Sequence, residues 1–127
     1  MTTQRYLTEL HQDHREWKNV LSLYADDLVV MNKRLEEVSH KNTDREMHAL
    51  VERFQNKLII QAEQIDVLQH DINTCEAELV EEVKENATAV NRRKMDDHAD
   101  LRDRMQTFEL LFNKLRKDLN TFVAKWM

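Results

Sequence analysis

The sequence predicts an all-α protein, an antiparallel up-down-up bundle of three long helices. The chain has no glycine and no proline in 127 residues, and 34% of its residues are charged. Average usage would supply roughly nine glycines and six prolines. Tight hairpin turns depend on glycine, so its absence argues against an antiparallel β-sheet. The apolar residues recur at alternating spacings of three and four, which is typical of helices that pack lengthwise at small crossing angles.

The first predicted helix covers about residues 3–39. A heptad seam runs through it, and nine of its ten residues are apolar. The seam consists of Leu7, Leu10, His14, Trp17, Leu21, Tyr24, Leu28, Met31, Leu35 and Val38. Asn42 follows the helix, and in a chain without glycine it is the residue best able to adopt a left-handed conformation in the turn.

The second predicted helix covers about residues 43–84. Residues Thr43 to Glu46 have the pattern of a capping box. In this motif the Thr43 hydroxyl accepts a hydrogen bond from the Glu46 amide, and the Glu46 carboxylate accepts one from the Thr43 amide. The seam that follows consists of Met47, Val51, Phe54, Leu58, Gln61, Ile65, Leu68, Ile72, Cys75 and Leu79. Extrapolated past Leu79, it would place charged residues inside the bundle, so we expect a turn near Lys84 to Thr88.

The third predicted helix covers about residues 88–126, and the three helices form a single domain over residues 1–127. Its seam consists of His98, Leu101, Met105, Phe108, Phe112, Leu115, Leu119, Phe122 and Trp126. The runner-up architecture is a long helical hairpin that dimerises, with a second arm unbroken through 43–127. Charge favours the bundle, because the acidic segment 43–85 and the basic segment 86–127 match electrostatically when they run antiparallel.

Composition and charge exclude several classes of function. Without glycine there is no phosphate-binding loop, dinucleotide fingerprint or nucleophile elbow. Neither Ser22 nor Ser39 lies near a suitable base and acid, so we expect no enzyme and no cofactor. The net charge of −5 argues against binding of nucleic acid. The longest apolar runs fall far short of the ~20 residues of a membrane span. The first residues lack a signal peptide, and Cys75 is the one cysteine, so we expect a cytoplasmic protein.

Three seam residues form a candidate metal site. His14, Cys75 and His98 point inward at the same end of the predicted rod, and His11 and Asp97 flank them. Two imidazoles, a thiol and a carboxylate are suitable ligands for a tetrahedral ion such as zinc. The sequence has none of the spacings of known metal motifs. The interpretation that we favour is therefore a pair of neutral histidines at the edge of the core, hydrogen-bonded to their neighbours.

A surplus of apolar residues predicts a surface for protein association. The adjacent pairs at 29–30, 59–60 and 110–111 lie off the seams and at nearly one height of the rod. One member of each pair must turn partly outward, and we expect Val30, Ile60 and Leu111 to form an interface. The predicted function is non-enzymatic protein–protein association, either as a homodimer or with another protein. The alternative is a metal-binding helical bundle.

Three stretches resemble those of a family of short helical bacterial proteins of unknown function. They are Leu10 to Trp17, Lys33 to Val38 and Phe54 to Gln61. The resemblance implies a bacterial cytoplasmic protein, and it implies no activity because none is established for the family. The three-helix coiled layout is also similar to that of spectrin-type repeats. The chain has one copy only, so a cytoskeletal role does not follow.

Overall fold

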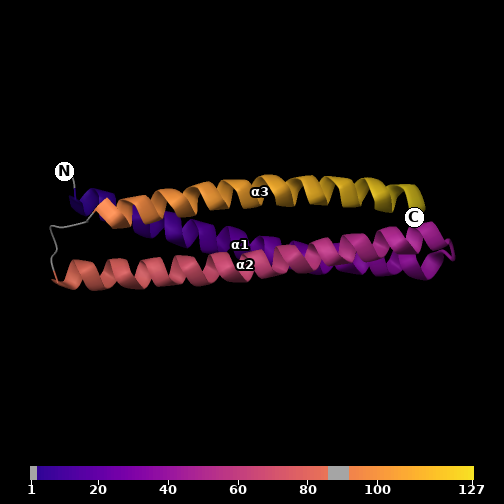
Figure 1. Cartoon of the computed structure of the whole chain (residues 1–127), viewed down its shortest axis with the longest axis horizontal. Coiled ribbons are helices and arrows are strands. Elements are labelled where there is room, and N and C mark those ends of the chain that lie inside the picture. Colours follow the sequence, from indigo (N-terminus) through magenta and orange to yellow (C-terminus); the bar gives the residue numbers. More distant parts are fainter. Residues whose placement is uncertain (1–2, 86–91) are drawn as a thin grey trace.

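The computed structural model describes the backbone of residues 3–85 and 92–127, and the side chains of residues 7–81 and 96–127. It contains the helices α1 (Thr3–Lys41), α2 (Arg45–Glu85) and α3 (Arg92–Trp126). They lie along one rod, with α2 antiparallel to the other two and the chain termini at opposite ends (Figure 1). Each helix packs against both others, so the predicted three-helix bundle is confirmed. Over their described residues, none of these helices has a segment apolar enough to cross a lipid bilayer.

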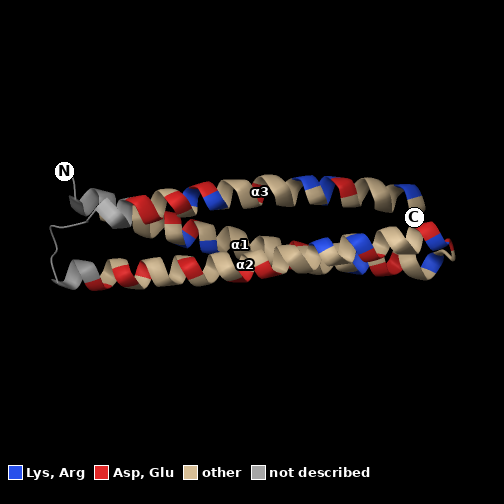
Figure 2. Cartoon of the chain, viewed as in Figure 1, with Lys and Arg blue, Asp and Glu red and all other residues tan. Residues whose placement is uncertain are grey.

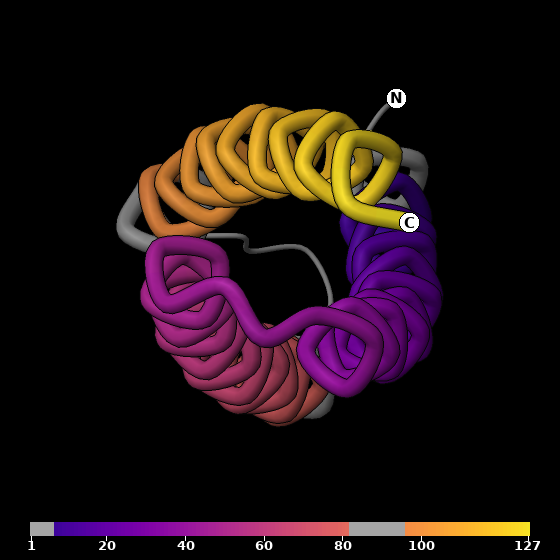
Figure 3. Tube along the Cα trace, turned by 90° about the vertical axis from the view of Figure 1, so that its right-hand side faces the viewer, coloured from indigo at the N-terminus to yellow at the C-terminus, as the bar shows by residue number. Residues whose placement is uncertain are grey.

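The three predicted seams form the core. Viewed end-on, the helices surround a common axis and wrap around one another (Figure 3). Every buried side chain in the described part of the chain belongs to one of the seams. The most deeply buried of them are Phe112, Leu21, Leu35, Met47, Ile72, Leu79, Met105, Leu119 and Val38. A heptad repeat keeps one face of each helix toward its neighbours over the whole length of the rod, which explains this agreement.

The α1–α2 turn differs from the predicted one in two ways. Helix α2 begins at Arg45, and the Asp44 carboxylate accepts from the Met47 amide at 2.9 Å. The N-cap is therefore Asp44, and the prediction of Thr43 was wrong by one residue. The prediction of a left-handed Asn42 was also wrong, because no residue in the described ranges has a positive φ. The Asn42 side chain instead donates to the carbonyl oxygens of Val38, at 2.9 Å, and Trp126, at 3.1 Å.

The connection between α2 and α3 rules out the alternative hairpin. Helix α2 ends at Glu85 and α3 begins at Arg92, and α3 packs back on both other helices. The second arm is therefore not one continuous helix. The turn expected near Lys84 to Thr88 lies largely outside the described residues, and so do the side chains of the basic run 92–94.

Polar side chains along the helix edges hold α3 in register with its neighbours. On one side Arg104 of α3 donates to Asp71 of α2 at 2.7 Å. On the other, Arg116 of α3 pairs with Asp27 of α1, and Arg34 of α1 donates to Asn120 at 2.9 Å. Charged side chains are spread along all three helices, while the middle of α3 is mostly uncharged (Figure 2). Exposed pairs of this kind add little stability, so their main effect is on register and orientation.

Candidate functional site

Two buried histidines form a polar layer near one end of the rod. His14 of α1 is 2% exposed and His98 of α3 is 3% exposed, and their ring centroids are 5.5 Å apart. The layer lies between the main core and a smaller apolar cluster of Leu7, Leu10 and Leu79. The sequence prediction that His14 and His98 point inward at the same end is confirmed.

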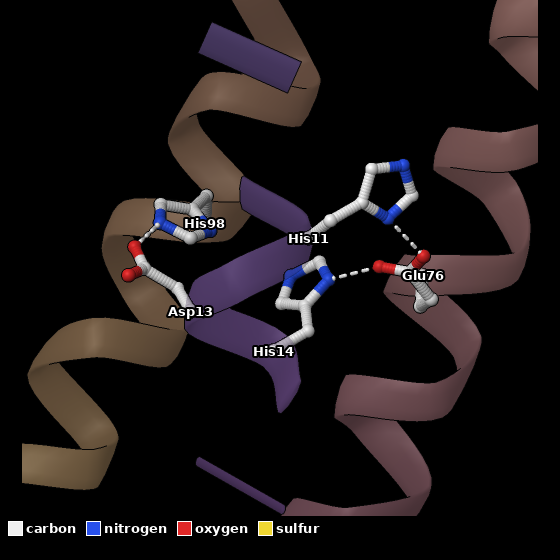
Figure 4. Close-up of polar contacts among 5 residues, drawn as sticks. All are labelled: His11, Asp13, His14, Glu76 and His98. Atoms are coloured by element: carbon white, nitrogen blue, oxygen red, sulfur yellow. Dashed lines mark hydrogen bonds and ion pairs between the residues drawn. The ribbon is translucent and has the colours of Figure 1, made fainter. Parts of the chain in front are cut away.

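A glutamate of α2 holds the α1 side of this layer (Figure 4). The Nδ1 atom of His14 donates to Glu76 Oε1 at 2.6 Å, and Nδ1 of His11 contacts the other carboxylate oxygen. Glu76 follows the seam residue Cys75, so it lies on the edge of α2 that faces α1.

An aspartate of α1 holds the α3 side of the layer. The Nε2 atom of His98 donates to Asp13 Oδ2 at 2.9 Å, and Arg102 lies 3.6 Å from the same oxygen. The indole of Trp17 stacks on the His98 ring with centroids 5.0 Å apart. Burial lowers the pKa of His98 below its usual 6.5, and the hydrogen bond and charge of Asp13 oppose this shift.

The other nitrogen of each ring has no hydrogen-bond partner among the residues that the structure describes. These atoms are His14 Nε2 and His98 Nδ1, and both are buried. In Figure 4 each of them lies on the side of its ring toward the other histidine. When a carboxylate accepts the proton of one ring nitrogen, the other nitrogen of a neutral imidazole is a free acceptor. In their neutral forms the two rings therefore present acceptor nitrogens to each other in the core.

Cys75, the third member of the candidate metal site, lies elsewhere. It lines a hollow between α2 and α3 together with Asp97, and neither His14 nor His98 lines that hollow. Within residues whose side chains are described, no group of three or more histidine, cysteine and acidic side chains has the geometry to hold a metal ion. The structure thus brings together two of the three predicted ligands, with Asp13 and Glu76 beside them.

The second candidate site is the α2–α3 groove, which we define as three neighbouring hollows between these helices. The central hollow has a volume of about 390 Å³. Its lining consists of Ile60, Gln61, Gln64, Leu68, Asp103, Arg104, Thr107, Phe108 and Leu111. A hollow toward the α1–α2 turn shares Ile60 and Leu111, and the one toward the α2–α3 connection shares Arg104. The middle of the groove combines apolar side chains with Asp103 and Arg104, and both ends carry charged side chains.

Ile60 and Leu111 are the predicted interface residues that the structure brings together. Each is 52% exposed, and they line the same two hollows from opposite helices. Val30 is also exposed but lies on another face. It is three residues from Asp27 and four from Arg34, which both bond to α3, so it faces the α1–α3 side.

The exposed apolar pairs are more open than predicted. One member of each pair was expected to turn partly outward, whereas both members of all three pairs are exposed. The three pairs lie on three helices, so they surround the rod and do not form one patch. The groove is where apolar side chains from two helices converge.

Comparison of the chain with protein-family models, with curated proteins and with solved structures finds no match.

Proposed function

We propose that this chain is a non-enzymatic association module that binds a protein through the α2–α3 groove. The observation that carries the proposal is the pair Ile60 and Leu111, half-exposed apolar side chains that line one groove from opposite helices. Burying such side chains stabilises by ~25 cal/mol for each Å² removed from water. A partner that covers the groove would gain this energy along with contacts to Leu68 and Phe108 beneath. The single cysteine supports a reducing compartment, the cytoplasm, as the site of action.

Site-specific photocrosslinking tests this function. A benzophenone amino acid replaces Leu111 in the groove or, as a control, Ile59, which is 57% exposed but faces away from the groove. The protein is irradiated in the cells that express it. Discrete adducts from position 111, and none from position 59, support the proposal. Equal labelling at both positions, or no adduct at either, contradicts it.

A matched pair of charge variants completes the test. Ile60→Glu places a charge in the groove, while Val29→Glu places one at an equally open apolar position on α1. We expect Ile60→Glu to remove the adducts from position 111 and Val29→Glu to leave them. Circular dichroism should show unchanged helicity for both variants, since neither side chain is in the core.

A second candidate function is the binding of a metal ion between His14 and His98. The observation that favours it is the pair of unpartnered nitrogens, each on a ring whose other nitrogen is held by a carboxylate. Metal-ligating histidines are usually oriented in this way, and imidazole suits zinc and copper. Elemental analysis of untagged protein tests it, with His70→Asn as an exposed control. This function is supported if the wild-type protein holds one metal ion per chain and the His98→Asn variant holds none. A wild-type protein without bound metal contradicts it.

A further inference from the structure

The α2 edge of the groove carries a heptad-spaced charge pattern. Lys57, Gln64 and Asp71 follow one another at intervals of seven residues, and each lines one of the three hollows. A seven-residue interval returns to the same side of a helix in a bundle of this kind. Along this edge a positive charge, a neutral residue and a negative charge are therefore equally spaced.

The α3 edge carries the same pattern in the same direction along the rod. Its residues are Lys114, Thr107 and Asp100, again at intervals of seven and again one in each hollow. Because α3 runs antiparallel to α2, the two lysines share the hollow toward the α1–α2 turn. The two aspartates share the hollow toward the α2–α3 connection. With every charged lining residue counted, the first hollow has Lys57, Lys114 and Asp118 and is net basic. The second has four acidic residues against Arg104, which pairs with Asp71 and Asp100, and is net acidic. Gln64 and Thr107 lie midway.

Two of the exposed apolar side chains of α2 lie on either side of Gln64 at nearly equal distances. Ile60 lies four residues before Gln64, and Val67 lies three residues after it. A half-turn about the level of Gln64 therefore brings Ile60 to within one residue of the level of Val67. The same half-turn exchanges the positions of Lys57 and Asp71.

We propose that a second copy of this chain covers the α2–α3 groove, antiparallel to the first, with a two-fold axis that crosses the groove at Gln64 and Thr107. The inference rests on the proposed function and names its partner. In this arrangement Ile60 of each copy packs beside Val67 of the other. Each Lys114 faces an Asp100, and each Lys57 faces an Asp71. A two-fold interface must be complementary to itself, and the opposite net charges of the two ends of the groove meet this requirement.

The charges also select the orientation. A parallel pair of rods would place the lysine end of one groove on the lysine end of the other, and the aspartate ends likewise. Like charges brought together at an interface oppose association. The antiparallel pair brings opposite charges together at both ends, while the middle of the groove is covered in either case.

A charge-swap experiment on α3 tests the arrangement. In a dimer of the Lys114→Glu variant, the acidic side chain at position 114 of each copy faces Asp100 of the other copy. In a dimer of the Asp100→Lys variant, the basic side chain at position 100 of each copy faces Lys114 of the other copy. Lys114 and Asp100 are both exposed, and the one ion pair among the described residues that Asp100→Lys breaks is the exposed pair of Asp100 with Arg104 at 3.8 Å, so we expect both variants to fold. Each variant replaces two contacts between opposite charges in the dimer by two contacts between like charges, so we expect each variant alone to dimerise about tenfold more weakly. An equimolar mixture of the two variants restores opposite charges at both contacts and should form a heterodimer at close to the original strength.

Light scattering across a concentration series reads the mass of each sample, and circular dichroism checks that each variant is folded. A wild-type dimer, weakened single variants and a restored mixture support the proposal. A wild-type chain that is monomeric at every concentration overturns it. A mixture no stronger than its components also overturns it, because the facing charges would then differ from those proposed.

Disulfide trapping locates the axis. In a Cys75→Ser background, Gln64→Cys lies at the axis, so two copies should crosslink through this position under mild oxidation. Lys57→Cys lies seven residues from the axis, so it should not crosslink to itself but should crosslink to Asp71→Cys in a mixture. Self-crosslinking at position 57 that exceeds that at position 64 overturns the proposal.

The two proposals fail separately. A monomeric chain that still yields photoadducts with a different protein from position 111 refutes the homodimer and leaves the association function standing. Absence of both self-association and adducts refutes both.

Discussion

Acidification should destabilise the bundle through His98. Burial lowers the pKa of His98, so the unfolded chain takes up this proton at a higher pH than the folded chain does. The associated stability is complete above the unfolded pKa of 6.5 and is lost as the pH falls below it. The groups that face His98 are Asp13, which favours the charged ring, and His14 and Arg102, which oppose it.

The magnitude follows from linkage. A histidine that stayed neutral in the folded state would cost ~1.4 kcal/mol of stability for each pH unit below 6.5. Between about pH 7.5 and pH 5.5 the loss from His98 is therefore at most ~1.4 kcal/mol. Its hydrogen bond to Asp13 brings the loss below this ceiling, because that contact stabilises the protonated ring.

Urea unfolding followed by circular dichroism at these two pH values measures the effect. The pH-induced loss should be smaller in His98→Asn than in the wild type, by up to ~1.4 kcal/mol. The control His70→Asn removes an exposed histidine and should leave the loss unchanged. The pH-induced loss is measured within each variant, so the effect of the substitution itself on the free energy of unfolding cancels. Equal losses in His98→Asn and the wild type would refute the reasoning, as would a wild-type chain that gains stability on acidification.

Four substitutions test the packing, the cap and the surface ion pair, each by urea unfolding. Phe112→Ala empties a fully buried core position and should lower the free energy of unfolding by about 3–5 kcal/mol; a loss under ~1 kcal/mol would contradict this burial. Asp44→Ala removes the N-cap of α2 and should cost ~1 kcal/mol, whereas Thr43→Ala should cost much less. Arg116→Gln breaks the partly exposed ion pair with Asp27 and should lower the free energy of unfolding by no more than ~1 kcal/mol. A larger loss would contradict the assignment of this pair to the solvent-exposed surface.

Which residues form the core could be read from the sequence, because a heptad repeat is a local property. Seam positions alone predict every buried side chain in the described ranges, including His14 and His98. The ends of α2 were less predictable. Thr43 and Asp44 are both good N-cap residues, and the choice depends on where the first helical turn begins. The Asn42 contact with the Trp126 carbonyl joins residues 84 positions apart, so no local pattern contains it.

The sequence by itself determined the helices, their antiparallel order and the inward direction of the two histidines, because periodicity and charge specify these features within each segment. Only the tertiary structure decided what the histidines touch. Asp13 and Glu76 flank seam positions, and they meet His98 and His14 because of the axial and rotational register between helices. Register likewise brought Ile60 and Leu111 into one groove and left Val30 on another face. Such register results from packing the whole core at once, and a single helix does not encode it.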